Sequence, residues 1–257
     1  MRIATFNANS VRKRLDAILE WIGEYEPDVL AIQETKVEDA AFPRDAFEEA
    51  GLHVAFHGMK SYNGVALVSR QPIESPSMGF GDPLWPDDCR ILSAEVNGLK
   101  IINTYVPNGT KVGSEKFDYK IKWLDRFAQY LAARYRADQP VVWLGDVNIA
   151  PTPLDVFDSP RHLGNVGHHP AEFEGLKRIV DFGLVDVYRQ HHQGQGEYTF
   201  WEFVIPRAVE RDLGWRIDHI YATEPLAAAC VDCQVDKEPR LREGPSDHTF
   251  VYADFDV

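Results

Sequence analysis

The chain has 257 residues, of which 44% are hydrophobic and 26% are charged. This balance is typical of a globular protein and excludes intrinsic disorder, and no apolar run approaches the roughly 20 residues that a membrane-spanning helix needs. The formal net charge of −13 argues at first against a polyanionic partner such as DNA. With three cysteines and no apolar signal-like segment at the N-terminus, we expect a cytoplasmic protein with no structural disulfides and no membrane partner.

Short runs rich in β-branched and aromatic residues predict strands along the whole chain. These runs are Arg2–Asn7, Asp28–Gln33, His53–Phe56, Val65–Ser69, Ile91–Val96, Lys100–Val106, Val141–Val147, Ile217–Tyr221, Cys230–Val235 and Thr249–Phe255. Apolar residues repeating every three or four positions predict helices over Val11–Tyr25 after a Ser10 cap, over Phe117–Tyr135, and over Phe173–Phe182 before Gly183.

Helices separate only some of the predicted strands, and turns join the others directly. Asn97-Gly98, for example, stands between two strand runs and is a strong hairpin signal. This mixture predicts an α/β (α+β) fold with mixed sheets, and about ten strands fill two packed sheets better than one. Since no repeat or linker divides the sequence, we expect one domain over residues 1–257 with two packed sheets and helices outside them.

Acids and amides stand at the ends of several predicted strands. Each has an ordinary explanation as a turn cap or a solvated side chain, but buried carboxylates are costly unless they are paired or metal-bound. Five such interruptions together favour one site, and their oxygen atoms suit Mg²⁺ or Mn²⁺ rather than zinc. Such a set is suited to phosphate-ester hydrolysis. Its members are Asn7, Glu34, Asp146, Asn148, Asp218, Asp247 and His248.

At these residues the sequence resembles the exonuclease III type of abasic-site (AP) DNA endonucleases, within the endonuclease–exonuclease–phosphatase superfamily. The matching segments occur in the family's order and span nearly the whole chain. They are Thr5–Arg12, Gln33–Lys36, Asn103–Gly109, Trp143–Thr152, Gly214–His219 and Ser246–His248. The resemblance implies a four-layer α/β sandwich, a monomer, and a DNA repair nuclease that associates with the nucleoid during repair.

The resemblance also implies what this enzyme does. It is expected to hydrolyse the phosphodiester 5′ to abasic sites in double-stranded DNA, with 3′→5′ exonuclease activity and 3′-phosphatase trimming of 3′-blocked ends. Its expected cofactor is Mg²⁺, with Mn²⁺ as a substitute. Glu34 is the expected metal ligand, with Asp247 nearby, and the amides of Asn7 and Asn148 are expected to hold the metal, water or phosphate, together with Asp146.

Catalytic roles follow from the same resemblance. Asp146 orients or deprotonates the attacking water, and Asn148 positions it. His248 contacts the phosphate and Asp218 orients its imidazole, while Tyr105 lies at the scissile phosphate. A cation and a charged imidazole oppose the negative charge that in-line attack places on the phosphate oxygens.

Further residues are expected to bind the substrate. Phe200, Trp215 and Ile217 match the family's small apolar pocket for the extruded abasic sugar; without the surrounding motifs, they would be interpreted as core aromatic and aliphatic residues. Arg12, within Arg12–Arg14, and Lys111, within the basic stretch Lys111–Lys122, are expected to contact the DNA backbone. A local basic rim reconciles the net charge with DNA and predicts only modest affinity for intact duplex.

Two alternatives remain open. The superfamily shares its catalytic set across substrates, so a phosphodiesterase or phosphatase acting on a non-DNA substrate has the same core. A non-catalytic nucleic-acid-binding regulator predicts gaps in this set, and the sequence has none. We assign no role to His162, His168 and His169 and no metal or redox role to Cys230 and Cys233, and we expect Cys89 to be a small packed residue.

Overall fold

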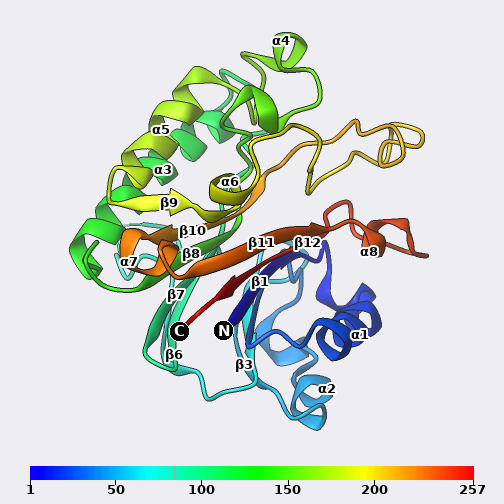
Figure 1. The fold of residues 1–257 in the computed structure, drawn as a ribbon. Coiled ribbons are helices and arrows are strands. Elements are labelled where there is room, and N and C mark those ends of the chain that lie inside the picture. Colours follow the sequence, from blue (N-terminus) through cyan, green and yellow to red (C-terminus); the bar gives the residue numbers. More distant parts are fainter. Residues whose placement is uncertain (84) are drawn as a thin grey trace.

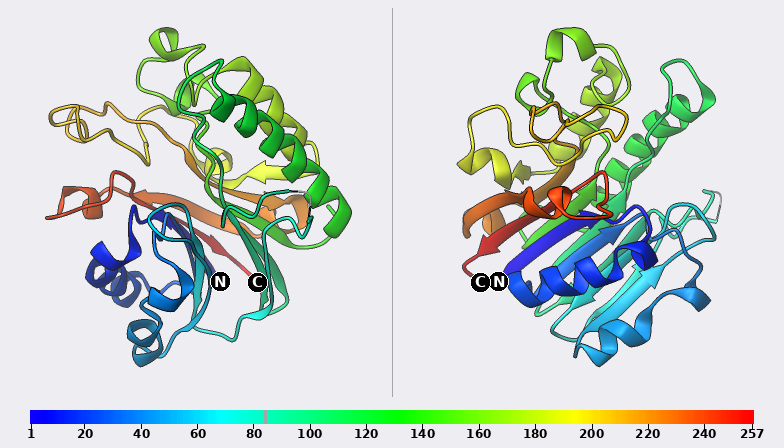
Figure 2. Two further views of the ribbon diagram at one scale, coloured as in Figure 1. Left: turned by 180° about the vertical axis from the view of Figure 1, so that it is seen from behind. Right: turned by 90° about the vertical axis from the view of Figure 1, so that its right-hand side faces the viewer.

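The computed structural model describes residues 1–83 and 85–257. Two six-stranded mixed sheets pack face to face and helices cover their outer faces (Figures 1 and 2). The first sheet has the order β11 (Cys230–Asp236), β12 (Phe250–Phe255), β1 (Arg2–Asn7), β2 (Val29–Gln33), β4 (Val65–Ser69) and β3 (His53–His57). The second has the order β5 (Glu74–Met78), β6 (Ile91–Val96), β7 (Leu99–Tyr105), β8 (Val141–Asp146), β10 (Asp218–Thr223) and β9 (Leu184–Asp186). This architecture confirms the predicted two-sheet α/β (α+β) sandwich.

The main core lies between the two sheets. Val65 and Leu67 of β4 face Leu92, Ile101 and Leu144 of the second sheet within one buried cluster. Strands β2, β4 and β8 are buried along their whole length. One face of each sheet packs against the other sheet and the opposite face packs against helices. These strands are therefore buried on both faces, which explains their continuous apolar sequences.

The helices form the two outer layers. On the first sheet lie α1 (Leu15–Tyr25) and α2 (Arg44–Glu49), and on the second lie α3 (Glu115–Arg134) and α5 (Pro170–Val180). Each outer layer closes an apolar cluster of its own, around Trp21 and Phe47 on one side and Trp123 and Phe127 on the other. The shorter helices are α4 (Ser159–His162), α6 (Val187–His191), α7 (Glu224–Ala227) and α8 (Glu238–Leu241), with 3-10 turns at Val11–Lys13, Asp39–Ala41 and Pro153–Asp155.

Several boundaries differ from the predictions. Ser10 was wrong as the cap of the long helix: it has a φ of 99°, its side chain makes no capping hydrogen bond, and a 3-10 turn separates it from α1, which begins at Leu15. The predicted strands omitted β5, an exposed edge strand with a mostly polar sequence, and β9, which has only three residues. The Asn97-Gly98 hairpin is confirmed, since both residues have the positive φ of a type I′ turn between β6 and β7.

Strand register places the predicted polar residues at one edge of the sandwich. In the first sheet, β1 and β2 are parallel and Asn7 pairs with Gln33, which precedes Glu34. In the second sheet, Asp146 pairs with Tyr105 in parallel β7 and with Asp218 in antiparallel β10.

Within the described residues, no helix is both long and apolar enough to cross a membrane.

Candidate active site

Asn7 joins carboxylates that come from different sheets. Its side-chain Nδ2 donates to Glu34 Oε1 at 2.9 Å and to Asp146 Oδ2 at 2.8 Å. Donor atoms of Glu34, Asp146 and His248 all lie within 4.8 Å of one another. Asp146 and His248 are buried, and the Glu34 side chain is 16% exposed. The group is therefore compact and partly accessible, and its two carboxylates offer the oxygen atoms that a metal ion binds.

His248 is held between two carboxylates. Its Nδ1 lies 2.7 Å from Asp218 Oδ2, and its Nε2 lies 3.8 Å from Asp146 Oδ2. Burial acts to lower the pKa of His248, but the charges of Asp218 and Asp146 outweigh it and raise the pKa to about 10. His248 is therefore a cation at neutral pH, with the Asp218 carboxylate fixing its ring.

The pKa of Asp146 shifts in the unusual direction for a carboxylate beside a cation. Burial raises its pKa, and although His248 acts to lower it, the charges of Asp218 and Glu34 help to hold it at about 7. Burial and the charges of Glu34 and Asp146 also raise the pKa of Tyr105 well above its usual value. The site thus has more negative charge than its own cations neutralise.

Asn148 shapes the loop after β8. It adopts a φ of 54°, and its main-chain N–H donates to Asp146 Oδ1 at 2.9 Å. Its side chain donates to the Val106 carbonyl at 2.9 Å and accepts from Asn108 Nδ2 at 3.0 Å. Asn148 therefore orients Asp146 through the main chain, while its amide joins the loops after β7 and β8.

Asp247 lies at the margin of the group formed by Glu34, Asp146 and His248. Its Oδ1 accepts from Asn9 Nδ2 at 2.9 Å, and Asn9 Oδ1 accepts from Lys36 Nζ at 2.5 Å. Lys36 also forms an ion pair with Glu34 Oε2 at 2.8 Å. Sequence reasoning gave no role to Lys36, although it stands in the matching segment Gln33–Lys36 and is the nearest basic side chain to that carboxylate.

The three predicted pocket residues lie in one apolar cluster beside the imidazole. Phe200, Trp215 and Ile217 cluster with Ala150, Val156 and Phe157. The ring centroid of Phe200 lies 4.9 Å from that of His248. The apolar cluster is thus directly adjacent to the polar group.

The structure also places the three unassigned histidines. The rings of His162 and His168 contact Trp215 edge-on, with centroid distances of 4.8 and 6.4 Å. His168 is buried and bonds through Nδ1 to the Ala150 carbonyl at 2.6 Å. His169 caps α5 by accepting from the Ala171 N–H. Two of these histidines therefore support the wall of the apolar cluster, and the third begins a helix.

Comparison with known proteins agrees with this geometry. A family model described as the Endonuclease/Exonuclease/phosphatase family matches residues 4–248. The chain belongs to the endonuclease/exonuclease/phosphatase family. It is 34% identical to the exodeoxyribonuclease III of Haemophilus influenzae, covering 99% of this chain and 100% of that protein.

Solved structures of family members superpose over the whole chain. An AP endonuclease from Archaeoglobus fulgidus is 44% identical with a TM-score of 0.97, and both chains are covered completely. The 3′ phosphatase NExo from Neisseria, solved bound to a product DNA hairpin, is 36% identical with a TM-score of 0.94 and again complete coverage of both chains. The fold of this family member and its neighbours is therefore the same from end to end.

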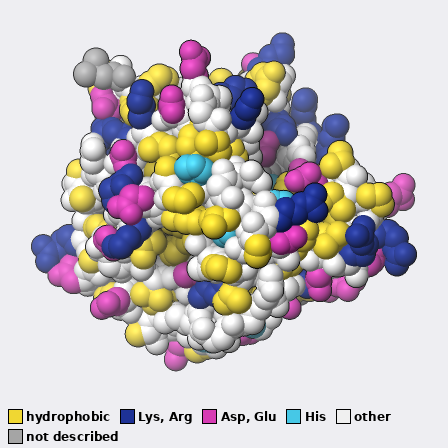
Figure 3. Space-filling view, turned by 90° about the horizontal axis from the view of Figure 1, so that it is seen from above, with side chains coloured by type: hydrophobic (Ala, Val, Ile, Leu, Met, Phe, Trp, Pro, Cys, Tyr) yellow, Lys and Arg dark blue, Asp and Glu magenta, His cyan; other side chains and the backbone are white. Residues whose placement is uncertain are grey.

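Basic side chains of this family member divide into exposed and buried ones. Arg12 and Lys111 are exposed, in agreement with an outward-facing role. Lys120, predicted as part of a basic DNA contact, is instead completely buried: its Nζ pairs with Glu172 Oε1 at 2.5 Å and donates to the Asn148 carbonyl at 2.8 Å. On the face seen in Figure 3, Lys and Arg side chains alternate with Asp and Glu rather than forming one basic field.

The C-x-x-C segment has no partner set for a metal in the described chain. Cys233 is buried in the inter-sheet core and Cys230 Sγ lies 3.4 Å from the Asp232 carbonyl. Both thiols are free, and neither belongs to a group of metal-ligating side chains among the described residues. His192, a neighbouring imidazole, bonds to the main-chain carbonyl of Cys233 at 2.7 Å.

Proposed function

We propose that this protein is a Mg²⁺-dependent DNA repair nuclease with a single catalytic domain over residues 1–257. It hydrolyses the phosphodiester 5′ to abasic sites in double-stranded DNA and trims blocked 3′ ends as a 3′→5′ exonuclease and 3′-phosphatase. The observation that carries this proposal is the acid-rich group of Glu34, Asp146 and His248 directly beside an apolar cluster. The first component hydrolyses phosphate esters, and the second accepts a sugar without its base.

The donor set fits a hard divalent cation. Glu34 and Asp146 offer carboxylate oxygens within one small group, and together with Asp218 these carboxylates outnumber the nearby cations, His248 and Lys36. Asp247 offers a further carboxylate at the margin of this group, the Asn7 amide and the Asn148 N–H hold the two carboxylates through hydrogen bonds, and Mn²⁺ has the same ligand preference. When bound, Mg²⁺ would offset charge on a phosphate oxygen and lower the pKa of the attacking water.

The chain's own residues divide the remaining work. Asp146 accepts the proton of the attacking water, and burial together with the neighbouring carboxylates raises its pKa, which strengthens it as a general base. His248, held as a cation by Asp218, donates to a phosphate oxygen and opposes the charge developing there. Tyr105, at the end of the neighbouring strand β7, stays protonated and donates a hydrogen bond to the scissile phosphate. Asn148 keeps the Asp146 carboxylate in position.

Substrate choice rests on the apolar cluster and the exposed basic residues. A nucleotide without its base leaves the duplex at low cost, and a small pocket excludes normal nucleotides. Phe200, Trp215 and Ile217 would receive the sugar, and Arg12 and Lys111 would contact the DNA backbone. The relation to an AP endonuclease and to the 3′ phosphatase NExo supports both the internal cut and the trimming of 3′ ends. We expect a monomer that works on nucleoid DNA in the cytoplasm.

One end-labelled duplex assay tests the proposal. The substrate is a duplex with one central abasic site, incubated with purified protein and Mg²⁺ or with EDTA. We expect one cut on the 5′ side of the lesion with Mg²⁺ and none with EDTA, and the same duplex without the lesion should be cut far more slowly. A lesion duplex left intact, together with faster hydrolysis of an RNA or small phosphodiester in parallel reactions, would favour a non-DNA substrate.

A further inference from the structure

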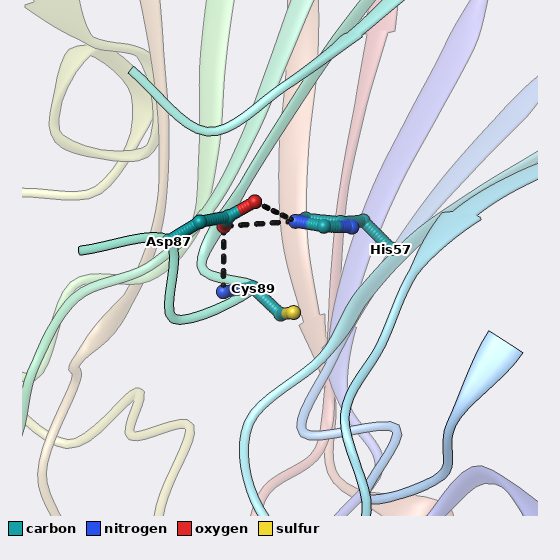
Figure 4. A group of neighbouring side chains, drawn as sticks. All are labelled: His57, Asp87 and Cys89. Atoms are coloured by element: carbon teal, nitrogen blue, oxygen red, sulfur yellow. Dashed lines mark hydrogen bonds and ion pairs between the residues drawn. The ribbon is translucent and has the colours of Figure 1, made fainter. Parts of the chain in front are cut away.

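A second group of metal-ligating side chains lies outside the candidate active site. His57 ends β3, and Asp87 and Cys89 lie in the segment before β6 (Figure 4). His57 Nε2 is 2.9 and 2.8 Å from the two carboxylate oxygens of Asp87. A donor atom of each of the three residues lies within 4.8 Å of the other two. The three side chains therefore converge from two separate segments of the chain.

We propose that His57, Asp87 and Cys89 form a second metal site that binds one transition-metal dication of the Zn²⁺ class. An imidazole, a carboxylate and a thiolate are the ligands that this class prefers, whereas Mg²⁺ takes oxygen ligands and keeps several waters. Zinc bonds of about 2.0–2.3 Å hold ligand atoms about 3.3–3.8 Å apart in a tetrahedral site. The observed spacing, within 4.8 Å for all three donor atoms, is close to this geometry, and a water molecule would be the fourth ligand.

The main chain directs the thiol of Cys89 toward the group. Cys89 adopts a φ of 55°, an uncommon conformation for a residue with a side chain. Two hydrogen bonds hold it there: its N–H donates to Asp87 Oδ1 at 3.1 Å, and its carbonyl accepts from the Gly64 N–H at 3.1 Å. Cys89 is also buried, as expected of a small packed residue, so these two hydrogen bonds hold its thiol in place beside Asp87 and His57.

The surroundings of the thiol favour a cation. Asp39, Asp87 and Asp88 all place negative charge near Cys89, and of these Asp88 is matched by an ion pair with Arg90. Binding of the dication replaces the thiol proton of Cys89, which passes to solvent, and forms the metal–sulfur bond without oxidation or reduction.

The proposed site joins two segments that support the candidate active site. The Gly64 N–H bonds to the Cys89 carbonyl, and the Gly64 carbonyl accepts from the N–H of Thr35, next to Glu34. On the other side, the Arg90 guanidinium lies 4.6 Å over the Tyr105 ring. A bound ion would thus fix the loops behind Glu34 and Tyr105 without touching the substrate.

Cobalt substitution tests the site by its spectrum rather than by nuclease activity. The full-length protein is titrated with Co²⁺ in excess Mg²⁺, and we expect a near-ultraviolet sulfur-to-cobalt charge-transfer band that saturates at one equivalent and is removed by Zn²⁺. The band should persist in Glu34→Gln, which alters the other site, and in Cys230→Ser, which removes a different thiol. It should disappear in Cys89→Ser. Absence of the band in the wild type, or its persistence in Cys89→Ser, would overturn the proposal.

Thermal unfolding provides a second readout. Zn²⁺ at 100 times its dissociation constant should raise the Tm by about 5–10 °C, with Mg²⁺ kept saturating. His57→Ala should abolish this shift, whereas His53→Ala, a change to an exposed histidine of the same strand, should retain it. If Zn²⁺ produces an equal shift in the wild type and in His57→Ala, the His57–Asp87 contact is only an ion pair and the proposal is wrong.

Discussion

Two buried groups of charged side chains lie next to each other in this fold, and burial affects them in opposite ways. The first is the catalytic group of Glu34, Asp146, Asp218 and His248. The second is centred on Arg216, which is 1% exposed and lies two positions before Asp218. Its guanidinium donates to Asp155 Oδ1 at 2.6 Å, to Asp186 at 3.2 and 2.7 Å, and to His219 Nδ1 at 2.9 Å, and Arg189 also pairs with Asp155.

The difference between the groups is the supply of internal cations. In the Arg216 group, burial acts to raise the pKa of Asp155 and Asp186, but the guanidinium lowers both below their usual value. In the catalytic group, the carboxylates outnumber the cations and the pKa of Asp146 rises to about 7. A charge-balanced group acts as structural support, whereas a group with excess negative charge is ready to bind a cation.

Removal of the general base should produce the largest effect. Asp146→Asn should lower abasic-site cleavage by roughly 10²–10⁴-fold, because it removes the proton acceptor. The metal-free variant should nonetheless unfold at the same denaturant concentration as the wild type or a higher one, since the substitution relieves repulsion from Glu34 and Asp218. Single-turnover kinetics and urea unfolding measure the two quantities. A large loss of stability would show that the catalytic group is structural after all.

Disrupting the charge-balanced group around Arg216 should have the opposite effect, a large loss of stability. Arg216→Leu leaves Asp155 and Asp186 buried without their main cation, so the free energy of unfolding should fall by about 3–5 kcal/mol. Arg207→Leu is the matched control, because Arg207 is exposed and, within the described residues, its side chain forms just a long ion pair with Glu210. Urea unfolding measures both variants, and equal losses in the two would contradict the assigned role of Arg216.

Magnesium should stabilise the protein through the catalytic group only. At 100 times its dissociation constant, Mg²⁺ should add about 2.7 kcal/mol to the free energy of unfolding. Glu34→Gln should remove most of this gain, whereas Asp186→Asn should keep it while starting from a lower stability. Thermal unfolding with and without Mg²⁺ measures the gain, and a gain of the same size in Glu34→Gln would exclude Glu34 as a ligand.

Acid should weaken the balanced group by a smaller amount. The pKa of Asp186 is lower in the folded state than in the unfolded state, so its stabilisation is full above the unfolded pKa and is lost as the pH falls toward the folded pKa. Between pH 6 and pH 3 this residue should account for a loss of about 1 kcal/mol. Asp186→Asn should show a correspondingly shallower decline in urea unfolding, and an identical decline would contradict the depressed pKa.

The sequence was informative where chemistry and strand ends coincide. Asn7, Glu34 and Asp146 stand at the ends of strands with a parallel neighbour, and Asp218 stands at the start of an antiparallel one, so within each sheet these positions meet at one edge and their convergence was predictable. The ion pairs could not be predicted in this way, because sequence spacing does not show which charged side chains are buried. Lys120 therefore passed for a DNA contact, although it pairs with Glu172 inside the protein.

Backbone conformation could not be predicted from the sequence either. Serine often caps a helix, but Ser10 bonds through its main-chain N–H to the Glu34 carbonyl and precedes a 3-10 turn, and α1 begins only at Leu15. Cys89 was expected to be a packed residue, and only the folded chain places it beside His57 and Asp87. Such contacts depend on tertiary neighbours that no local pattern identifies.

The hydrogen bonds of Asn7 also make the geometry of the site depend on the distance between the two sheets. Asn7 and Glu34 belong to the first sheet and Asp146 to the second, and the His248–Asp218 pair crosses the same boundary. A small shift of one sheet against the other changes every catalytic distance at once. Substitutions in the core between the sheets, as at Val65 or Leu144, would therefore change the catalytic distances. They would lower activity even where both sheets remain folded.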